Sequence, residues 1–284
     1  MAYQDIYSLI HSRYTTFTNT EKKVADYILA NAKDVLYMSI TDLADACCVG
    51  ESSVFRFCKS MDLKGYQEFK IVLAHSVSLE DETPQLSSQI TMQDTIPELS
   101  SKILSTNINA LTETYNLIEE KDIQRAAESM IKAERIHFFG VGSSLVTALE
   151  AKSKFMRITN KTECSIDSHL QSMSASLLTE KDVAIVISYS GSTKDTIEIA
   201  KTAKEKGATI ISITRFAKSN LTYYSDITLL CGANEGPLQG GSLTAKISQL
   251  YLLDLLYFAY FKGTNKESIY NKEQTAKAVV EKML

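Results

Sequence analysis

The sequence predicts two domains of different class: an all-α domain, then an α/β domain built on a parallel sheet. The first indication is length, because 284 residues fit two domains more readily than one. The second is a change of pattern. Residues 1–77 show helical periods, whereas short β-branched segments alternate with helical ones from residue 135 onward. Such alternation is typical of a sheet covered by helices on both faces.

Within the first domain, the pattern predicts a pair of short helices. A capping box at residues 18–21 opens an earlier helix. Residues 39–50 then read as a short helix that ends at Gly50, and residues 51–61 read as a second one. Two short helices joined by a turn of three or four residues that contains glycine predict a helix-turn-helix.

A polar segment separates the two domains. The text VSLEDETPQLSSQITMQD begins at Val77, has little clear period and contains Pro84, as linkers do. We therefore expect a helix-turn-helix domain at 1–77, a linker at 78–94 and the second domain at 95–284, including a helical tail.

The second domain is predicted to be a five-stranded, doubly wound α/β fold. Two helices open it, at about 96–117 and 121–133. The strands are expected at 135–139, 162–166, 182–188, 209–214 and 226–230, with helices at 143–158, 168–178 and 192–206 between most of them. A mostly apolar helix follows at 242–261. Its apolar surface is broader than one stripe, so it is either deeply buried or packed on a partner subunit.

Two loops rich in hydroxyl groups follow predicted strands and lead directly into helices. They are GVGSS at 140–144 and SYSGST at 188–193. Ligands of open parallel sheets bind at the carboxyl ends of the strands, and a helix N-terminus offers unpaired N–H groups to an anion. The predicted ligand-binding residues are Gly142, Ser143, Ser144, Ser188, Ser190, Gly191, Ser192, Thr193 and the acidic Glu235.

A simpler interpretation of these hydroxyl groups is N-capping. Ser192 with Asp195 fits a capping pattern, and Ser143 can cap its own helix. The loops match neither common nucleotide-binding pattern, because Lys194 does not follow a glycine and Leu145 stands where a third glycine is needed. A small phosphorylated compound fits better, with hydroxyl groups of the protein matching those of a sugar.

The two loops, the late GSLTAKISQL segment and the stretch ITDLADACCVGESSVFRFCKSMDLKGYQEFK resemble RpiR-type transcription regulators. The resemblance covers about residues 1 to 262, and its most specific part runs from Val54 to Glu68. It implies an N-terminal helix-turn-helix joined to a sugar isomerase (SIS) domain that senses a phosphosugar. It further implies a cytoplasmic bacterial regulator of a carbohydrate-metabolism operon, with operator DNA as partner. A homo-oligomer, dimer or tetramer, would be joined through the SIS domains.

Three positions depart from the family pattern. Gly50 stands where the family often has serine, and glycine serves as an N-cap with little loss. Asp62 stands where the family often has glycine, and aspartate tolerates left-handed backbone better than most residues. Gln239 stands where the family often has arginine, after the acidic Glu235, which removes a cation expected to hold the phosphate.

The second helix of the helix-turn-helix is expected to read DNA, because its N-terminal part enters the major groove in this motif. Its apolar stripe leaves the other residues facing outward or sideways. Those predicted to reach base edges are Ser52, Ser53 and Arg56, and those predicted to contact phosphates are Lys59, Lys64 and Lys70. The alternatives are a surface salt bridge for Arg56 and ordinary solvated charges for Lys64 and Lys70.

Composition excludes several classes of protein. No apolar run reaches the roughly 20 residues that span a bilayer, and the N-terminus has no signal-peptide pattern. Five cysteines without a C-x-x-C pair argue against a disulfide framework or a zinc cage, and for a reducing compartment. We expect no cofactor, no metal and no membrane partner. The net charge of −4 gives no global sign of nucleic-acid binding, but a local basic face is sufficient.

Two other functions fit parts of the sequence. A sugar-phosphate isomerase with a helical accessory domain would need a base, for which Glu235, Asp167 and His169 are candidates. A scaffold with a vestigial helix-turn-helix would not bind DNA. Fusion of a ligand site to a DNA reader favours sensing, so we expect no enzymatic activity.

Overall fold

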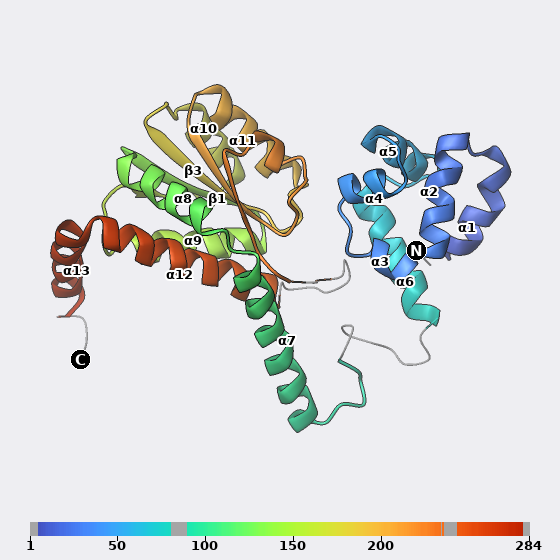
Figure 1. The fold of residues 1–284 in the computed structure, drawn as a ribbon, viewed down its shortest axis with the longest axis horizontal. Helices are drawn as coiled ribbons and strands as arrows, with labels where there is room; N and C mark the ends of the chain where they lie inside the picture. Colours follow the sequence, from blue (N-terminus) through green and yellow to red (C-terminus); the bar gives the residue numbers. More distant parts are fainter. Residues whose placement is uncertain (1–4, 81–89, 234, 236–242, 281–284) are drawn as a thin grey trace. The chain divides into compact units, whose positions relative to one another are not determined.

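The structure, a computed structural model, describes residues 5–80, 90–233, 235 and 243–280. It divides into two compact units (Figure 1). The first contains the described residues up to Asn107 together with Glu235 and Leu243, and the second contains Ile108–Ala233 and the residues from Thr244 onward. Helix α7 (Ile96–Asn116) begins in the first unit and ends in the second. Each unit has a hydrophobic core of its own.

The first unit is all-α, as predicted. Its helices are α1 (Ile6–Arg13), α2 (Asn19–Ala30), α3 (Ala32–Val35), α4 (Ile40–Ala46), α5 (Glu51–Ser60) and α6 (Tyr66–Glu80). The predicted capping box is confirmed, since the Thr18 hydroxyl accepts from the Glu21 N–H and the Glu21 carboxylate accepts from the Thr18 N–H at 2.8 Å. Helix α6 continues into the segment predicted as a linker, of which residues 81–89 lie outside the described residues.

The helix-turn-helix consists of α4, α5 and the tight turn between them (Figure 1). The Val49 N–H bonds back to the Ala44 carbonyl at 2.9 Å, and Cys48 adopts a left-handed φ of 51°. This arrangement is the usual six-to-one closure of a helix C-terminus, with cysteine where glycine is commonest. The Thr41 hydroxyl donates to the Glu51 carboxylate at 2.6 Å, which fixes the second helix against the first.

The C-terminus of α5 is closed by the same six-to-one hydrogen bond. The Leu63 N–H bonds to the Cys58 carbonyl at 3.1 Å, and Asp62 lies between them with a φ of 61°. The expectation that Asp62 tolerates left-handed backbone is therefore confirmed. Its carboxylate also pairs with Arg13 at 2.6 Å, which ties α1 to the end of α5.

The second unit contains a parallel five-stranded sheet of order β2-β1-β3-β4-β5. The strands are β1 (Arg135–Gly140), β2 (Thr162–Glu163), β3 (Asp182–Ile187), β4 (Thr209–Thr214) and β5 (Ile227–Leu230). The sequence predicted β2 to extend to Ile166, and this is wrong. Strand β2 pairs with β1 only at Thr162 and Glu163, after which the chain leads toward the next helix.

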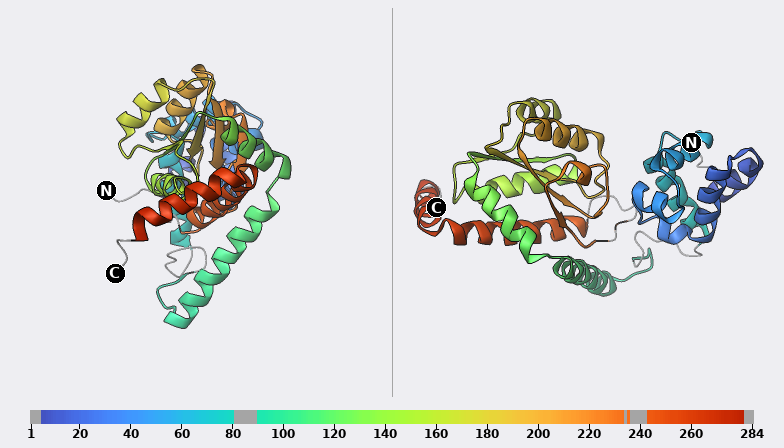
Figure 2. Two further views of the ribbon diagram at one scale, coloured as in Figure 1. Left: turned by 90° about the vertical axis from the view of Figure 1, so that its left-hand side faces the viewer. Right: turned by 45° about the horizontal axis from the view of Figure 1, so that its top comes forward.

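Helices cover both faces of this sheet, as predicted (Figures 1 and 2). Those of the second unit are α8 (Glu120–Lys132), α9 (Ser143–Phe155), α10 (Ser168–Ser176), α11 (Lys194–Glu205), α12 (Ala245–Gly263) and α13 (Asn265–Val280). Helices α8, α9 and α12 share one core with the sheet, and α10 and α11 share another on the opposite face. Leu252, Leu253 and Leu256 are at most 1% exposed, so the long apolar helix is largely buried within its own chain.

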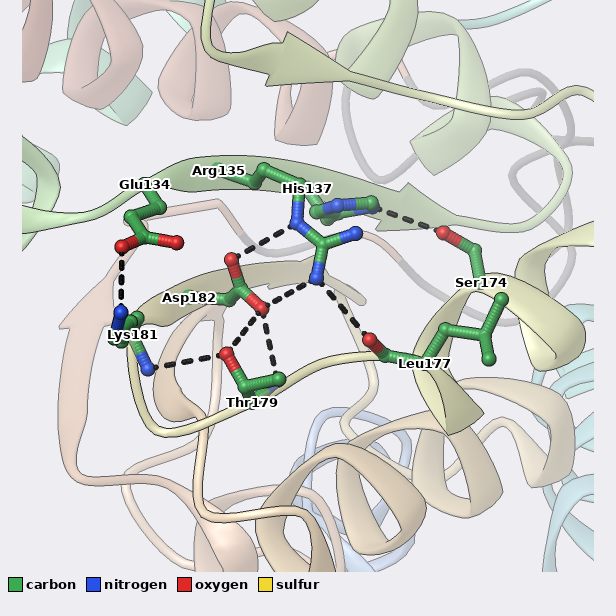
Figure 3. A network of polar contacts seen from close by, with 8 residues as sticks. All are labelled: Glu134, Arg135, His137, Ser174, Leu177, Thr179, Lys181 and Asp182. Carbon is green, nitrogen blue, oxygen red and sulfur yellow. Dashed lines mark hydrogen bonds and ion pairs between the residues drawn. The ribbon is translucent and has the colours of Figure 1, made fainter.

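The amino ends of β1 and β3 are held by an ion-pair network (Figure 3). Asp182 is 1% exposed, and its two oxygens accept from Arg135 Nε at 3.0 Å and Nη2 at 2.8 Å. Burial acts to raise the pKa of Asp182, but hydrogen bonds from Arg135 and Thr179 hold this pKa below its ordinary value. The network lies at the opposite end of the strands from the hydroxyl-rich loops, so we assign it to stability.

Within the described part of the chain, no helix has both the length and the apolar character to cross a membrane. The same residues contain no group of three or more His, Cys, Asp or Glu side chains arranged to hold a metal ion.

Candidate ligand-binding site and DNA-reading surface

The two hydroxyl-rich loops leave the sheet next to each other. Gly140 pairs with Ile187 at the carboxyl ends of β1 and β3, and the loops at 140–144 and 188–193 continue from these two residues. The chain crosses to β2 on one side of β1 and to β3 on the other. The loops therefore lie at a topological switch point, which is where open α/β sheets bind ligands.

The first loop gives α9 an N-terminus without a side-chain cap. The N-cap residue is Gly142, with φ of 61° and ψ of −128°, a backbone conformation suited to glycine. Ser143 is the first helical residue and is exposed, whereas Ser144 is 8% exposed. Ser143 does not act as the N-cap, so the first N–H groups of α9 have no side chain of their own helix as partner.

The second loop gives α11 an N-terminus of the same kind. Its N-cap residue, Thr193, makes no capping hydrogen bond through its side chain. Ser192 does not cap the helix either, since its hydroxyl donates to the Ser190 carbonyl at 3.1 Å and its N–H donates to the Ser190 hydroxyl at 3.2 Å. N-capping therefore does not explain these loops. By contrast, Asp167 caps α10 by accepting from the Leu170 N–H at 3.0 Å.

Of the hydroxyl residues in the two loops, Ser143 and Thr193 are exposed, whereas Ser144 is 8% and Ser188 3% exposed. Among the residues that the structure describes, none donates to or accepts from the side chains of Ser143, Ser144, Ser188 and Thr193. Together with the two uncapped helix N-termini, they form a set of donors that can follow the oxygens of a phosphate or a sugar.

Gly191 fixes the second loop against the segment that follows β4. Its φ is 58°, and its carbonyl accepts from the Leu221 N–H at 3.0 Å. A Cβ atom on Gly191 would lie 2.2 Å from the Ser219 hydroxyl oxygen and 3.2 Å from the Thr214 hydroxyl oxygen. The Thr214 hydroxyl also donates to the Tyr189 carbonyl at 3.1 Å. Only glycine fits this position without displacing the loop.

Sequence reasoning missed the residues that support the loops. Gln171 on α10 bonds both backbone groups of Gly140, and Ser219 packs on Gly191. Neither residue stands near its loop in the sequence. The helical pattern gives no signal for Gln171 either, because the apolar Leu170 and Met173 of the same helix are exposed while Gln171 is 1% exposed.

The remaining candidates of this region are placed as follows. Glu235 is half-buried and groups with the first unit, so its expected place beside the loops stays a prediction. Gln239 lies outside the described residues. Asp167 has a structural task as the cap of α10, and His169 is exposed on the first turn of that helix.

Helix α5 presents an exposed polar face. Ser52, Arg56, Lys59 and, beyond the helix, Lys64 are exposed. Phe55 is 44% exposed, and the Lys59 ammonium lies 5.5 Å from the centre of its ring. This contact is a cation–π interaction that holds the lysine along the helix surface.

Two residues expected to contact DNA, Ser53 on α5 and Lys70 on α6, are buried instead. Ser53 is 7% exposed, so its predicted outward orientation is wrong, and its hydroxyl accepts from Arg56 Nη2 at 3.2 Å. Lys70 is 8% exposed, and its ammonium donates to the Met38 carbonyl at 3.0 Å, so it does not form part of a phosphate-contacting surface. Burial lowers the pKa of Lys70 to about 8. In both cases neighbouring helices bury a residue that the apolar stripe of its own helix places on the surface.

Comparison with known proteins agrees with this architecture. Residues 4–80 match the model of the helix-turn-helix domain, rpiR family, and residues 129–259 match that of the SIS domain. A transcriptional regulator of the helix-turn-helix type from Haemophilus influenzae is 36% identical over 282 residues, which cover 99% of this chain and 98% of the relative. The chain belongs to the rpiR family of transcriptional regulators.

Two further relatives of this rpiR-family protein are informative. The regulator HexR of Pseudomonas aeruginosa is 35% identical, and the match covers 87% of this chain and 86% of HexR. The solved structure of Vibrio vulnificus NanR complexed with ManNAc-6P is 30% identical, with a TM-score of 0.87 over 98% of this chain and 99% of NanR. A putative sugar-phosphate isomerase of Listeria monocytogenes, 19% identical with a TM-score of 0.55 over 62% of this chain and 98% of the isomerase, shows the shared fold alone.

Proposed function

We propose that this rpiR-family regulator binds a phosphosugar at the carboxyl edge of its sheet and thereby modulates the affinity of α5 for operator DNA. The observation that carries the proposal is the pair of adjacent helix N-termini, α9 and α11, whose N–H groups lack side-chain caps. Such N–H groups favour an anion such as phosphate. The hydroxyl groups of Ser143, Ser144, Ser188 and Thr193 then match the hydroxyl groups of the sugar.

The relative NanR supports this choice of ligand class, because its solved structure contains ManNAc-6P. Gly142 lets the backbone approach the ligand, whereas Gly191 packs the second loop against Ser219. Ser190 and Ser192 shape this loop through their mutual hydrogen bonds. Glu235 would contact the sugar from the segment after β5. An amino-sugar phosphate is accordingly the first candidate, and an operon of carbohydrate metabolism is the expected target.

For DNA, we assign base contacts to Ser52 and Arg56 and phosphate contacts to Lys59 and Lys64. Ser53 takes a different role from the one the sequence predicted. Its hydroxyl accepts from Arg56, so it orients the guanidinium on the helix face.

The proposed regulator is a cytoplasmic homo-oligomer. Its SIS unit carries an exposed apolar stripe along α10, formed by Leu170, Met173 and Leu177, each at least 52% exposed, and by the preceding Ile166 at 71%. Side chains at this spacing share one helix face, and an exposed apolar face of this kind marks an interaction surface. A two-fold dimer would read a palindromic operator.

We further propose that the bound sugar phosphate is sensed and not converted. The isomerase alternative requires a base at the site, and Asp167 is engaged in capping α10. Turnover of a hexose phosphate that is lost in His169→Ala or Glu235→Gln would favour the isomerase instead.

A thermal-shift screen tests the ligand. Hexose and amino-sugar phosphates, N-acetylmannosamine 6-phosphate among them, are compared with their unphosphorylated parents. At a hundredfold over Kd, binding adds about 2.7 kcal/mol to stability, which is a rise of several degrees in Tm. A shift with a sugar phosphate and none with its parent supports the proposal, whereas no shift across the panel contradicts it.

A further inference from the structure

Helix α10 reaches the first ligand loop through one buried side chain. Gln171 is 1% exposed and lies on the face of α10 that packs on the sheet. Its Oε1 accepts from the Gly140 N–H at 3.2 Å, and its Nε2 donates to the Gly140 carbonyl at 3.0 Å. Both backbone groups of the last residue of β1 are therefore held by one amide.

This amide takes the place of a missing strand. Ile136 donates its N–H to Lys161 at 2.9 Å, so the backbone groups of Ile136 point toward β2. Groups of alternate strand residues point to the same side, which directs those of Gly140 toward β2 as well. Strand β2 has ended by then, since its last partner on β1 is His137. An uncharged amide side chain both donates and accepts in this geometry, which an ionised carboxylate or an ammonium group cannot do.

The position of Gly140 in turn sets the first turn of α9. A Cβ atom on Gly140 would lie 2.7 Å from the Ser144 carbonyl oxygen and 3.0 Å from the Leu145 nitrogen. The strand end and the helix start are thus in direct contact, without room for adjustment. Whatever fixes Gly140 also fixes the uncapped N–H groups of Ser143 and Ser144.

We propose that Gln171 is a positioning residue for the phosphosugar. It holds the 140–144 loop in the position in which the N–H groups at the start of α9 face the phosphate. This role rests on the proposed function of the loops. It also makes α10 the element that joins the ligand loop to an exposed apolar face.

The test compares two variants of the full-length chain. Gln171→Leu keeps most of the side-chain volume and removes both bonds to Gly140. Ser174→Ala is the matched control, because it removes the other polar contact between α10 and β1, the Ser174 hydroxyl to His137 Nδ1 at 2.9 Å, at a position away from the loop. Binding of N-acetylmannosamine 6-phosphate and of inorganic phosphate is measured by calorimetry.

Gln171→Leu should weaken binding about tenfold, which corresponds to about 1.4 kcal/mol, while Ser174→Ala should leave Kd unchanged. A purely structural role would weaken both variants alike, and that outcome overturns the proposal. Unchanged binding by Gln171→Leu overturns it as well.

Gln171→Glu adds a readout that a loss of folding cannot imitate. The ionised carboxylate cannot donate to the Gly140 carbonyl, but the protonated form can, and burial raises the pKa of such a carboxyl group. The ratio of its Kd to that of the wild type should therefore fall from about ten at pH 8 toward one as the pH is lowered to about 5.5. A ratio independent of pH contradicts the proposed bonds.

Amide hydrogen exchange at Ser143–Leu145 separates this inference from the proposed function. If the wild type binds neither probe, the proposed ligand is refuted. Exchange that is faster in Gln171→Leu than in Ser174→Ala would still show that Gln171 holds the loop, and equal exchange would show that it does not.

Discussion

The substitution Gly191→Ala tests how tightly the second ligand loop is built. Two costs add. The φ of 58° is unfavourable for alanine by about 1 kcal/mol. The new Cβ would also lie 2.2 Å from the Ser219 Oγ and 2.6 Å from its Cβ, an overlap whose relief costs about 2 kcal/mol. We expect a loss of about 3 kcal/mol, or a fall in Tm of about 6–12 °C for a unit of this size.

A double-mutant cycle separates the two costs. Ser219→Gly removes both overlapping atoms, so Gly191→Ala should cost only about 1 kcal/mol in that background, a coupling of about 2 kcal/mol. Denaturant unfolding of the four proteins, followed by circular dichroism, measures this difference. An equal cost in both backgrounds would refute the steric argument and leave only the backbone strain.

Four other substitutions probe separate parts of the molecule. Lys70→Met should raise stability at neutral pH by up to about 3 kcal/mol, because the folded pKa of about 8 lies below the ordinary 10.5. Between pH 8 and 10.5 the unfolded wild type binds more protons than the folded wild type, so the stability of the wild type rises with pH and the advantage of the variant shrinks. A stability difference between variant and wild type that stays constant from pH 7 to 10 would contradict the burial of a charged amine. Arg56→Ala should weaken specific DNA binding by about 1–3 kcal/mol, whereas Lys59→Ala should weaken binding to all sequences alike, as titrations with specific and random duplexes can determine. Asp182→Asn should cost about 1–3 kcal/mol above pH 4, where the wild-type carboxylate is ionised in both states, and less as the pH falls through its lowered folded pKa; acid denaturation curves that coincide with those of the wild type would count against the network in Figure 3.

Local chemistry made much of the fold predictable. The capping box at Thr18 and the left-handed Asp62 each depend on a few consecutive residues, which the sequence displays directly. The strands β1, β3, β4 and β5 are short apolar runs, so their order along the chain was readable. The adjacency of the two hydroxyl-rich loops followed from the rule that parallel strands end at the same edge.

Features that depend on neighbouring helices were not predictable in the same way. Ser53 and Lys70 lie on polar positions of their own helices, yet other helices of the first unit cover them. Helix α10 reverses the usual pattern, because its apolar Leu170 and Met173 are exposed while the polar Gln171 is buried. Gln171 bonds to Gly140, a residue on a different element, so its burial leaves no periodic signal in the sequence.

Strand β2 is shorter than the sequence predicts, and Gln171 is involved here as well. Residues 162–166 as a whole read as a short strand, and pattern alone extends it to Ile166, whereas the pairing ends at Glu163. Strand β2 ends at Glu163, and the Gln171 amide bonds the Gly140 backbone groups that a longer strand would have bonded. A side chain makes the hydrogen bonds that a neighbouring strand would otherwise make, and sequence patterns do not reveal such an exchange.

The central claim is that one chain couples phosphosugar binding to DNA binding. Its most direct test is the Kd for a fluorescent operator duplex, selected on the protein from random sequences, measured with and without a saturating sugar phosphate from the screen. Coupling of about 1–3 kcal/mol predicts a change in Kd of about five- to 150-fold, and none with the unphosphorylated parent. An unchanged Kd in the presence of a sugar phosphate that demonstrably binds would contradict the account.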